Sequence, residues 1–228
     1  MSVIAVFGGT GFIGSCLSEK LIARGYRVRL LVRDPIKARE FSEKEGFEVV
    51  EGALPDLAAI TKCIEGGSSD FSGDPSGVVS GVINVTGQRG RSKAEMQTLV
   101  EGNRNIIVAM EALGVNPYIK ISGTSVRLPG EKFPLMRHLL DIAFRVLLPN
   151  PTRCKYLEQE DILASQLDWV MVRPPAIVDK PASKPLQAHE YQHLGMSIYR
   201  EDLCEFMIDQ LDSSRWFHRC PVLGYKKV

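Results

Sequence analysis

The chain has 228 residues, 44% of them hydrophobic and 24% charged, with a formal net charge of +1 at pH 7. A soluble domain of ordinary composition is therefore expected, and neither nucleic acid nor an acidic membrane surface is predicted as a partner. No apolar run reaches the roughly eighteen residues of a membrane span, and the N-terminus lacks the basic start of a secretory leader, so we expect a cytoplasmic protein.

Short apolar runs alternate with stretches of helical periodicity along the chain. The first run, residues 3–7, leads into glycines and then into apolar residues at helical spacing. Further strands are predicted at 27–32, 47–52, 78–85, 118–122 and 169–173, and further helices near 94–113 and 153–165. This alternation needs crossover connections, and apolar runs without clean alternation suit strands that are covered on both faces. We predict an α/β fold, with a doubly wound, mostly parallel sheet and helices on both faces.

Three segments interrupt this alternation. Residues 66–77 are rich in glycine, serine and aspartate and predict a loop insertion; since they precede a strand, they should lie at the sheet edge away from a ligand. Residues 133–151 predict a helix that is apolar on most sides, as in a core or a pocket wall, with a dimer contact as the alternative. Residues 179–195 predict a long loop with at most a short helical piece. We expect a single domain over residues 1–228, with segments 127–150 and 179–195 as a small substrate-side elaboration.

The cysteines give no sign of a metal module. No two of them lie two or three residues apart, so a cysteine-rich zinc site is not expected. Their odd number argues against a disulfide framework. We expect free thiols in a reducing compartment. The five are Cys16, Cys63, Cys154, Cys204 and Cys220.

The stretch "VFGGTGFIG" links the first strand to the first helix and carries glycines at positions 8, 11 and 14. In a dinucleotide-binding turn, the first glycine permits the tight turn, the second lets a pyrophosphate approach the backbone, and the third lets helix and strand pack closely. Backbone N–H groups at the helix start then bind the phosphates. Because strand, glycines and helix occur in this order, the sequence predicts a dinucleotide site.

The second strand ends at Arg33, which lies 19 residues after Gly14. The residue about 20 positions on reads the ribose 2′ position: an acid there bonds the 2′-hydroxyl of NAD, whereas arginine grips the 2′-phosphate of NADP. Lys37 offers a second positive charge. Asp34 is the complication, but it precedes Pro35 and is expected to act as a turn or cap residue. We therefore favour NADP(H) over NAD(H).

With these residues placed, the chain resembles an atypical short-chain dehydrogenase/reductase. The stretches "GGTGFIG", "LVRDPIKA", "LDWVMVRPPAI" and "YREDLCEFMIDQL" resemble NmrA-like NAD(P)-binding members, and among them the biliverdin-IXβ reductase/flavin reductase group. The resemblance covers residues 1 to about 212, is fairly specific for the cofactor, and is not specific for the substrate. It implies a Rossmann fold.

The resemblance implies a set of cofactor-binding residues. Arg33 and Lys37 match the basic positions for the 2′-phosphate, and Leu54 falls where an Asp-Leu or Asp-Val pair flanks the adenine, although the aspartate place is Ala53 here. The other matches lie in the phosphate loop, in a Gly-x-Arg after the fourth strand, and in the turn beside the nicotinamide: Gly8, Thr10, Gly11, Phe12, Ile13, Gly14, Gly87, Arg89, Pro174, Pro175 and Ile177.

The resemblance also implies catalytic positions, and here the chain departs from the pattern. Thr124 falls at the catalytic Ser/Thr place, and Lys155 matches the lysine that holds the nicotinamide ribose. Pro151 stands where a tyrosine should donate a proton. Tyr156 points about 100° away on a helix, and Ala176 replaces a histidine found in some relatives. The usual proton donors are therefore missing.

The absence of a proton-donating side chain limits the acceptors that we expect this protein to reduce. Flavins and quinones accept hydride without a strong protein acid beside them, whereas simple carbonyls gain a hundredfold or more from one. We predict an NADPH-dependent oxidoreductase that transfers hydride to a flavin-, quinone- or similarly conjugated small-molecule acceptor. The alternative is a non-catalytic NADP(H)-binding sensor or assembly factor with a protein partner. Arg89, Arg91 and Lys93 are candidates for binding an anionic substrate or the cofactor phosphates, or form a solvated basic loop.

Residues 188–193, "AHEYQH", contain the His-Glu-x-x-His spelling of a zinc peptidase. Such a site needs both histidines on one face of a regular helix and a third ligand, whereas Pro185 and Gly195 leave room for barely two turns. We interpret the motif as a chance match and expect no metal. His189, Tyr191 and His193 are instead candidates for a replacement proton source, or belong to a solvated loop.

Overall fold

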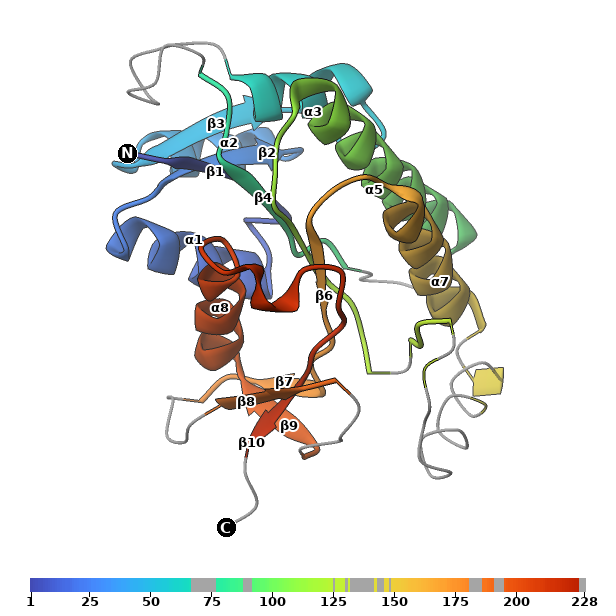
Figure 1. Cartoon of the computed structure of the whole chain (residues 1–228). Helices are drawn as coiled ribbons and strands as arrows, with labels where there is room; N and C mark the ends of the chain where they lie inside the picture. Colours follow the sequence, from blue (N-terminus) through green and yellow to red (C-terminus); the bar gives the residue numbers. More distant parts are fainter. Residues whose placement is uncertain are drawn as a thin grey trace.

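The computed structural model describes residues 1–66, 77–87, 92–124, 126–129, 131, 142, 146–147, 149–180, 186–190 and 195–225. Its centre is a sheet of six parallel strands in the order β3-β2-β1-β4-β5-β6 (Figure 1). The predicted strands are confirmed to within a few residues: β1 (Val3–Phe7), β2 (Arg27–Val32), β3 (Phe47–Glu51), β4 (Gly81–Asn84), β5 (Tyr118–Ile121) and β6 (Trp169–Val172).

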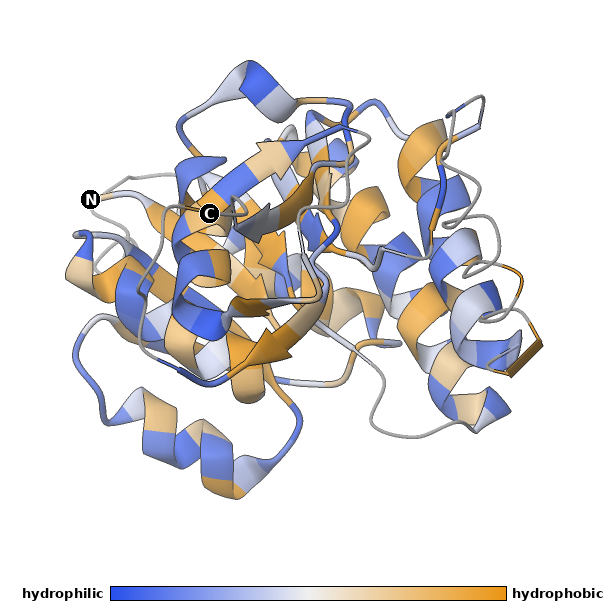
Figure 2. Cartoon of the chain, turned by 90° about the horizontal axis from the view of Figure 1, so that it is seen from below, coloured by the Kyte–Doolittle hydropathy of each residue, from blue (hydrophilic) through white to orange (hydrophobic). Residues whose placement is uncertain are grey.

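Helices cover both faces of this sheet. Val3, Ala5 and Phe7 of β1 pack into a core shared with three helices, α3 (Leu57–Glu65), α5 (Lys93–Leu113) and α7 (Pro149–Ala164). Ile4 and Val6 point the other way, into a core shared with α1 (Phe12–Ala23), α2 (Pro35–Ser42) and α8 (Arg200–Asp209). Figure 2 shows hydrophobic strands between helices that carry both hydrophobic and hydrophilic residues. This two-sided burial is why the central strands appear in the sequence as mainly apolar runs, and it confirms the doubly wound α/β fold.

Helix α7 begins earlier than the sequence pattern indicates. It starts at Pro149 and contains Pro151 in its first turn. Proline is tolerated there because the first N–H groups of a helix have no intrahelical partner. Pro151 therefore lies on the helix one turn before Lys155, which is the place that the tyrosine of the family pattern would occupy.

The C-terminal part adds two small sheets, which the sequence prediction missed. β7 (Ala176–Val178) pairs in parallel with β9 (Ser197–Tyr199), and β8 (Leu186–His189) pairs antiparallel with β10 (Val222–Tyr225), after the short 3-10 helix η1 (Ser214–Trp216). The prediction of a loop over 179–195 is thus wrong for 186–189. Leu186 and Ala188 pack on the core while Gln187 and His189 are exposed, a pattern too short to recognise without its distant partner strand.

Several predicted features lie outside the described residues. They are most of the 66–77 insertion, most of segment 127–150, the stretch 88–91 with Arg89 and Arg91, and residues 191–194 with Tyr191 and His193. Within the described part of the chain, no helix is both long and apolar enough to cross a membrane.

Candidate functional site

The glycine turn between β1 and α1 has the geometry that its spacing predicts at two positions. Gly8 has a φ of +84°, and a Cβ on it would lie 2.9 Å from the backbone nitrogen of Thr86. A Cβ on Gly14 would lie 2.1 Å from the carbonyl oxygen of Gly8. No side chain fits at either position, because the turn and the packing of α1 on β1 leave no space.

Gly11 is different, because the protein itself does not demand a glycine there. Its φ is −88°, which any residue adopts, and a Cβ would meet only the Gly8 carbonyl oxygen, at 3.2 Å. Gly11 starts α1 without a side-chain cap, and the first turn holds no acidic residue. The bare N-terminus of α1 therefore suits an anion bound closely against the backbone, as a dinucleotide pyrophosphate would be.

A cavity of about 430 Å³ opens over this turn at the carboxyl ends of β1 to β4. It brings together nine of the residues that the resemblance implies, from four separate stretches of chain. They are Gly8, Thr10, Gly11, Phe12, Ile13, Gly14, Arg33, Leu54 and Gly87. Its lining also includes residues that sequence reasoning missed: Phe7, Leu31, Gly52, Ala53, Val85, Thr86, Glu95, Thr98 and Leu99.

A basic residue lines the end of this cavity that follows β2, and the acid next to it is turned away. Arg33 is exposed, follows β2 and lines the cavity. Asp34 is the N-cap of α2, and its carboxylate accepts from the backbone N–H groups of Ile36, at 2.9 Å, and Lys37, at 3.4 Å. The acid is thus engaged in capping, as its place before Pro35 suggests. Lys37 lies half-buried in the first turn of α2 and is not among the lining residues.

Leu54 is held in the cavity wall by α5. A Cβ on Gly102 would come within 2.7 Å of the Leu54 Cβ, so only glycine lets the two segments pack this closely. The Asn105 side chain donates to the backbone carbonyl of Pro55 at 3.0 Å. These contacts fix the loop after β3 although Ala53 lacks the aspartate of the family pattern.

The other predicted residues in the described part of the chain do not line this cavity. Thr124 follows β5 and is half-buried, Pro174 and Pro175 link β6 to β7, and Ile177 lies within β7. Lys155 is half-buried on α7. Burial lowers the pKa of Lys155, Lys120 lowers it further, and Glu158 opposes the change.

Lys120 was missed by sequence reasoning, although its charge stands out in the apolar stretch "YIKIS". It lies on β5 and is 2% exposed, and its Nζ is 2.9 Å from Glu158 Oε1 on α7, itself 8% exposed. The same ammonium donates to the carbonyl and the hydroxyl of Thr86, at 3.4 and 3.5 Å. A buried charge pair therefore touches a residue that lines the cavity.

A second hydrogen-bonded path joins the same two points. Thr86 donates its hydroxyl to Asn84 Oδ1 at 2.6 Å, and Asn84 Nδ2 donates to the Tyr118 hydroxyl at 2.8 Å. Tyr118 donates to Asn103 Oδ1 at 2.7 Å, and Asn103 Nδ2 donates to the backbone carbonyl of Glu158 at 3.3 Å. With the Lys120 contacts this closes a buried polar ring that fixes α5 and α7 against the ends of β4 and β5.

Arg173, directly after β6, holds together segments that are distant in the sequence. Its guanidinium donates to both carboxylate oxygens of Glu131, at 2.7 and 2.8 Å, and to the backbone carbonyls of Val126, Cys220 and Glu190, at 3.0, 2.8 and 2.9 Å. Arg173 and Glu131 are 2% and 3% exposed. One buried ion pair thus ties the start of the segment 127–150 to β10 and to the end of β8.

The zinc interpretation finds no support in the described residues. His189 is the last residue of strand β8 rather than part of a helix, and the carboxylate of Glu190 pairs with Arg219. Across the described ranges, no group of three histidine, cysteine, aspartate or glutamate side chains is arranged to hold a metal ion.

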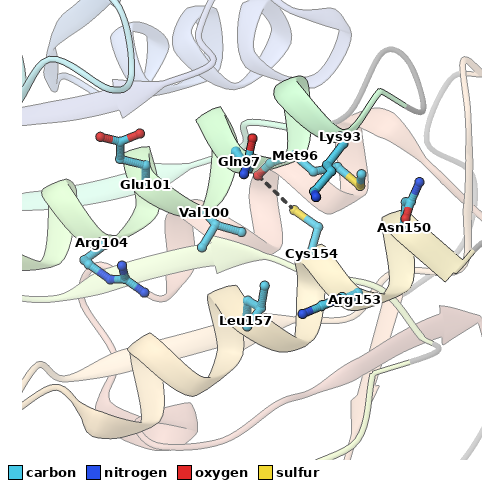
Figure 3. Close-up of a pocket in the computed structure, with 10 residues that line it drawn as sticks. All are labelled: Lys93, Met96, Gln97, Val100, Glu101, Arg104, Asn150, Arg153, Cys154 and Leu157. Carbon is cyan, nitrogen blue, oxygen red and sulfur yellow. Dashed lines mark hydrogen bonds between the residues drawn. The ribbon is translucent and has the colours of Figure 1, made fainter.

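A second cavity, of about 610 Å³, lies between α5 and α7 (Figure 3). All of its lining residues come from these two helices, and Figure 3 shows Cys154 reaching across to the α5 backbone, where its Sγ lies 3.8 Å from the Met96 carbonyl. Because it has no glycine turn and no strand end, this groove lacks the features that bind a dinucleotide. The smaller cavity has both of these features.

Comparisons with known proteins identify the family and the fold. The sequence profile of a family described as NAD(P)H-binding matches residues 8–214. A ceramide reductase of Caulobacter vibrioides is 27% identical over 176 residues, covering 77% of this chain and 46% of that protein. The chain spans 32% and 46% of the length of two curated relatives that it matches.

Solved structures share the whole fold. ChuY, an anaerobilin reductase from Escherichia coli O157:H7, superposes with a TM-score of 0.77 at 17% identity, covering 100% of this chain and 98% of that one. A short-chain dehydrogenase/reductase from Veillonella parvula, solved in complex with NADP, has a TM-score of 0.73 at 18% identity, covering 98% and 94%. At such identities the likeness shows the fold alone.

Proposed function

Because the chain belongs to the NAD(P)H-binding family, we propose that it is an NADPH-dependent oxidoreductase that transfers hydride to a flavin-, quinone- or similarly conjugated acceptor. The observation that carries the proposal is the cavity that joins the uncapped N-terminus of α1 to Arg33, with Asp34 turned into the cap of α2. A cytoplasmic location fits a cofactor of this kind and remains part of the proposal.

In this proposal the cavity holds the nucleotide along its length. Backbone N–H groups of α1 bind the pyrophosphate, Arg33 binds the 2′-phosphate, and Leu54 packs beside the adenine. Strands β2 and β3 lie on one side of β1, and β4 and β5 on the other. The nicotinamide half therefore extends toward β4 and β5, where Thr86 and Gly87 line the cavity.

The residues around the nicotinamide half determine which acceptors are suitable. Bound NADPH supplies the hydride, and the protein must bind, orient and exclude water. Lys155 holds the ribose hydroxyls and Thr124 hydrogen-bonds the acceptor or the carboxamide. Pro151, one turn before Lys155 on α7, has no proton to give. A conjugated acceptor suits such a site, because its reduced form takes up a proton from solvent without a positioned acid.

The test is NADPH oxidation at steady state with three acceptors: FMN, a naphthoquinone and dichlorophenolindophenol. We expect turnover with at least one of them and none when NADPH is omitted. Lys155→Met should reduce turnover and leave a folded protein. NADPH binding without turnover on any acceptor would overturn the reductase proposal.

A second candidate is a non-catalytic sensor or assembly factor whose occupancy by NADP(H) sets the binding of a protein partner. Pro151 favours this second candidate, because it stands at the place of the tyrosine that donates a proton when carbonyl substrates are reduced. The same assay separates the two candidates, since a sensor binds the nucleotide and oxidises none of it.

A further inference from the structure

Three charged side chains gather below the carboxyl ends of β4 and β5. Lys120 and Glu158 form the buried pair at 2.9 Å, and Lys155 lies one turn before Glu158 on α7. Lys155 interacts electrostatically with both: burial lowers its pKa, Glu158 opposes this change, and Lys120 lowers the pKa further. Two lysines thus share one carboxylate, which leaves one net positive charge in a region with little water to screen it.

This charge lies next to the cavity. Lys120 Nζ is 3.4 Å from the carbonyl oxygen of Thr86 and 3.5 Å from its hydroxyl, and Thr86 lines the cavity. A cofactor group against Thr86 is therefore separated from the ammonium by a single residue. The strand order places this part of the cavity on the β4 and β5 side of the glycine turn, away from Arg33.

We propose that Lys120, Glu158 and Lys155 make the site selective for the reduced form of the nucleotide, NADPH, over NADP⁺. The inference rests on the proposed function. The two forms differ in charge only at the nicotinamide ring, which is neutral when reduced and positive when oxidised. A net positive cluster below the ring repels the oxidised form alone. At a separation of about 10 Å and an effective dielectric constant of about 20, Coulomb's law gives roughly a tenfold preference.

Other charges near the cavity do not produce the same selectivity. Arg33 acts at the 2′-phosphate, which both redox forms carry. Glu95 lines the cavity from the first turn of α5, and its charge stays constant in every variant below. The ratio of the two dissociation constants therefore isolates the cluster.

The test is calorimetric titration of the full chain with NADPH and with NADP⁺, read as the ratio of the two dissociation constants. Lys120→Met leaves Lys155 and Glu158 with no net charge, and should reduce the preference for NADPH about tenfold. The double variant Lys120→Met/Glu158→Gln returns the cluster to one positive charge, carried by Lys155. Its ratio should return to the wild-type value. If Lys120 only positioned its neighbours, replacing its partner Glu158 as well would not restore the ratio of dissociation constants.

The matched control is Glu48→Gln. It breaks another ion pair of a buried strand cation, in which Arg29 Nε lies 2.6 Å from Glu48 Oε2 at the opposite edge of the sheet, and Arg29 is 0% exposed. This variant should keep the wild-type ratio. An unchanged ratio in Lys120→Met, or a double variant that stays at the single-variant value, would overturn the inference while the proposed function stands. Binding of neither nucleotide by the wild type would overturn the proposed function and the inference with it.

Discussion

A substitution at Gly11 should affect nucleotide binding and leave folding nearly unchanged. A side chain at this position fits within the protein but would obstruct the bound nucleotide. In Gly11→Ala the new Cβ meets only the Gly8 carbonyl oxygen, at 3.2 Å, and the φ of −88° suits alanine. Alanine is a poorer N-cap than glycine but reduces the entropy of the unfolded chain, and the two effects offset each other. We expect the free energy of unfolding to change by less than about 1 kcal/mol.

The same methyl group projects toward the place of the pyrophosphate. Loss of one charge-assisted hydrogen bond from the N-terminus of α1 is worth about 1.5–3 kcal/mol, which weakens NADPH binding roughly 10- to 150-fold. Urea denaturation measures the stability and calorimetry the affinity. Gly14→Ala is the contrasting variant: its Cβ would lie 2.1 Å from the Gly8 carbonyl oxygen, so it should lose stability as well as binding. Wild-type affinity in Gly11→Ala would refute the placement of the pyrophosphate.

Two further predictions concern the core. Glu131→Gln removes the bidentate partner of buried Arg173 and should lower the free energy of unfolding, measured by thermal unfolding, by about 3 kcal/mol. Arg219→Gln breaks the more exposed pair with Glu190 and should lower the free energy of unfolding by under about 1 kcal/mol. Equal losses would show that Arg173 anchors nothing. Burial raises the pKa of Cys63 from 9.0 to about 12, so the unfolded chain loses this proton first and stability falls as pH rises from 9 toward 12. The decline due to this thiol is about 1.4 kcal/mol per pH unit, and Cys63→Ala should flatten the curve of unfolding free energy against pH by that slope; an unchanged curve would contradict the assignment.

The sequence predicts the parts of the fold that local pattern encodes. Strands β1, β4, β5 and β6 are buried along their whole length, so each appears in the sequence as a mainly apolar run. The glycine turn is recognisable from three glycines between strand and helix. The capping role of Asp34 follows from its place before Pro35 and is confirmed. Strand β8 could not be found in this way, since its pairing with β10 joins residues more than thirty positions apart.

The polar ring is the clearest case of a feature that sequence alone does not reveal. Lys120 is conspicuous as a charge in an apolar strand, but its partner Glu158 is one of several acids on α7, and nothing local distinguishes it. Thr86 likewise follows its strand without a motif of its own. Only the fold brings β4, β5 and α7 together, so the charge beside the cavity appears only in three dimensions.

Calorimetric titration of the wild type and of Arg33→Asp, each with NADPH and with NADH, tests whether this chain binds NADPH through Arg33 at the 2′-phosphate. We expect the wild type to bind NADPH at least about tenfold more tightly than NADH, because an arginine–phosphate hydrogen bond is charge-assisted. In Arg33→Asp this difference should disappear while NADH still binds. Equal affinities in the wild type, or equal losses of both nucleotides in the variant, would refute the placement of Arg33 at the 2′-phosphate.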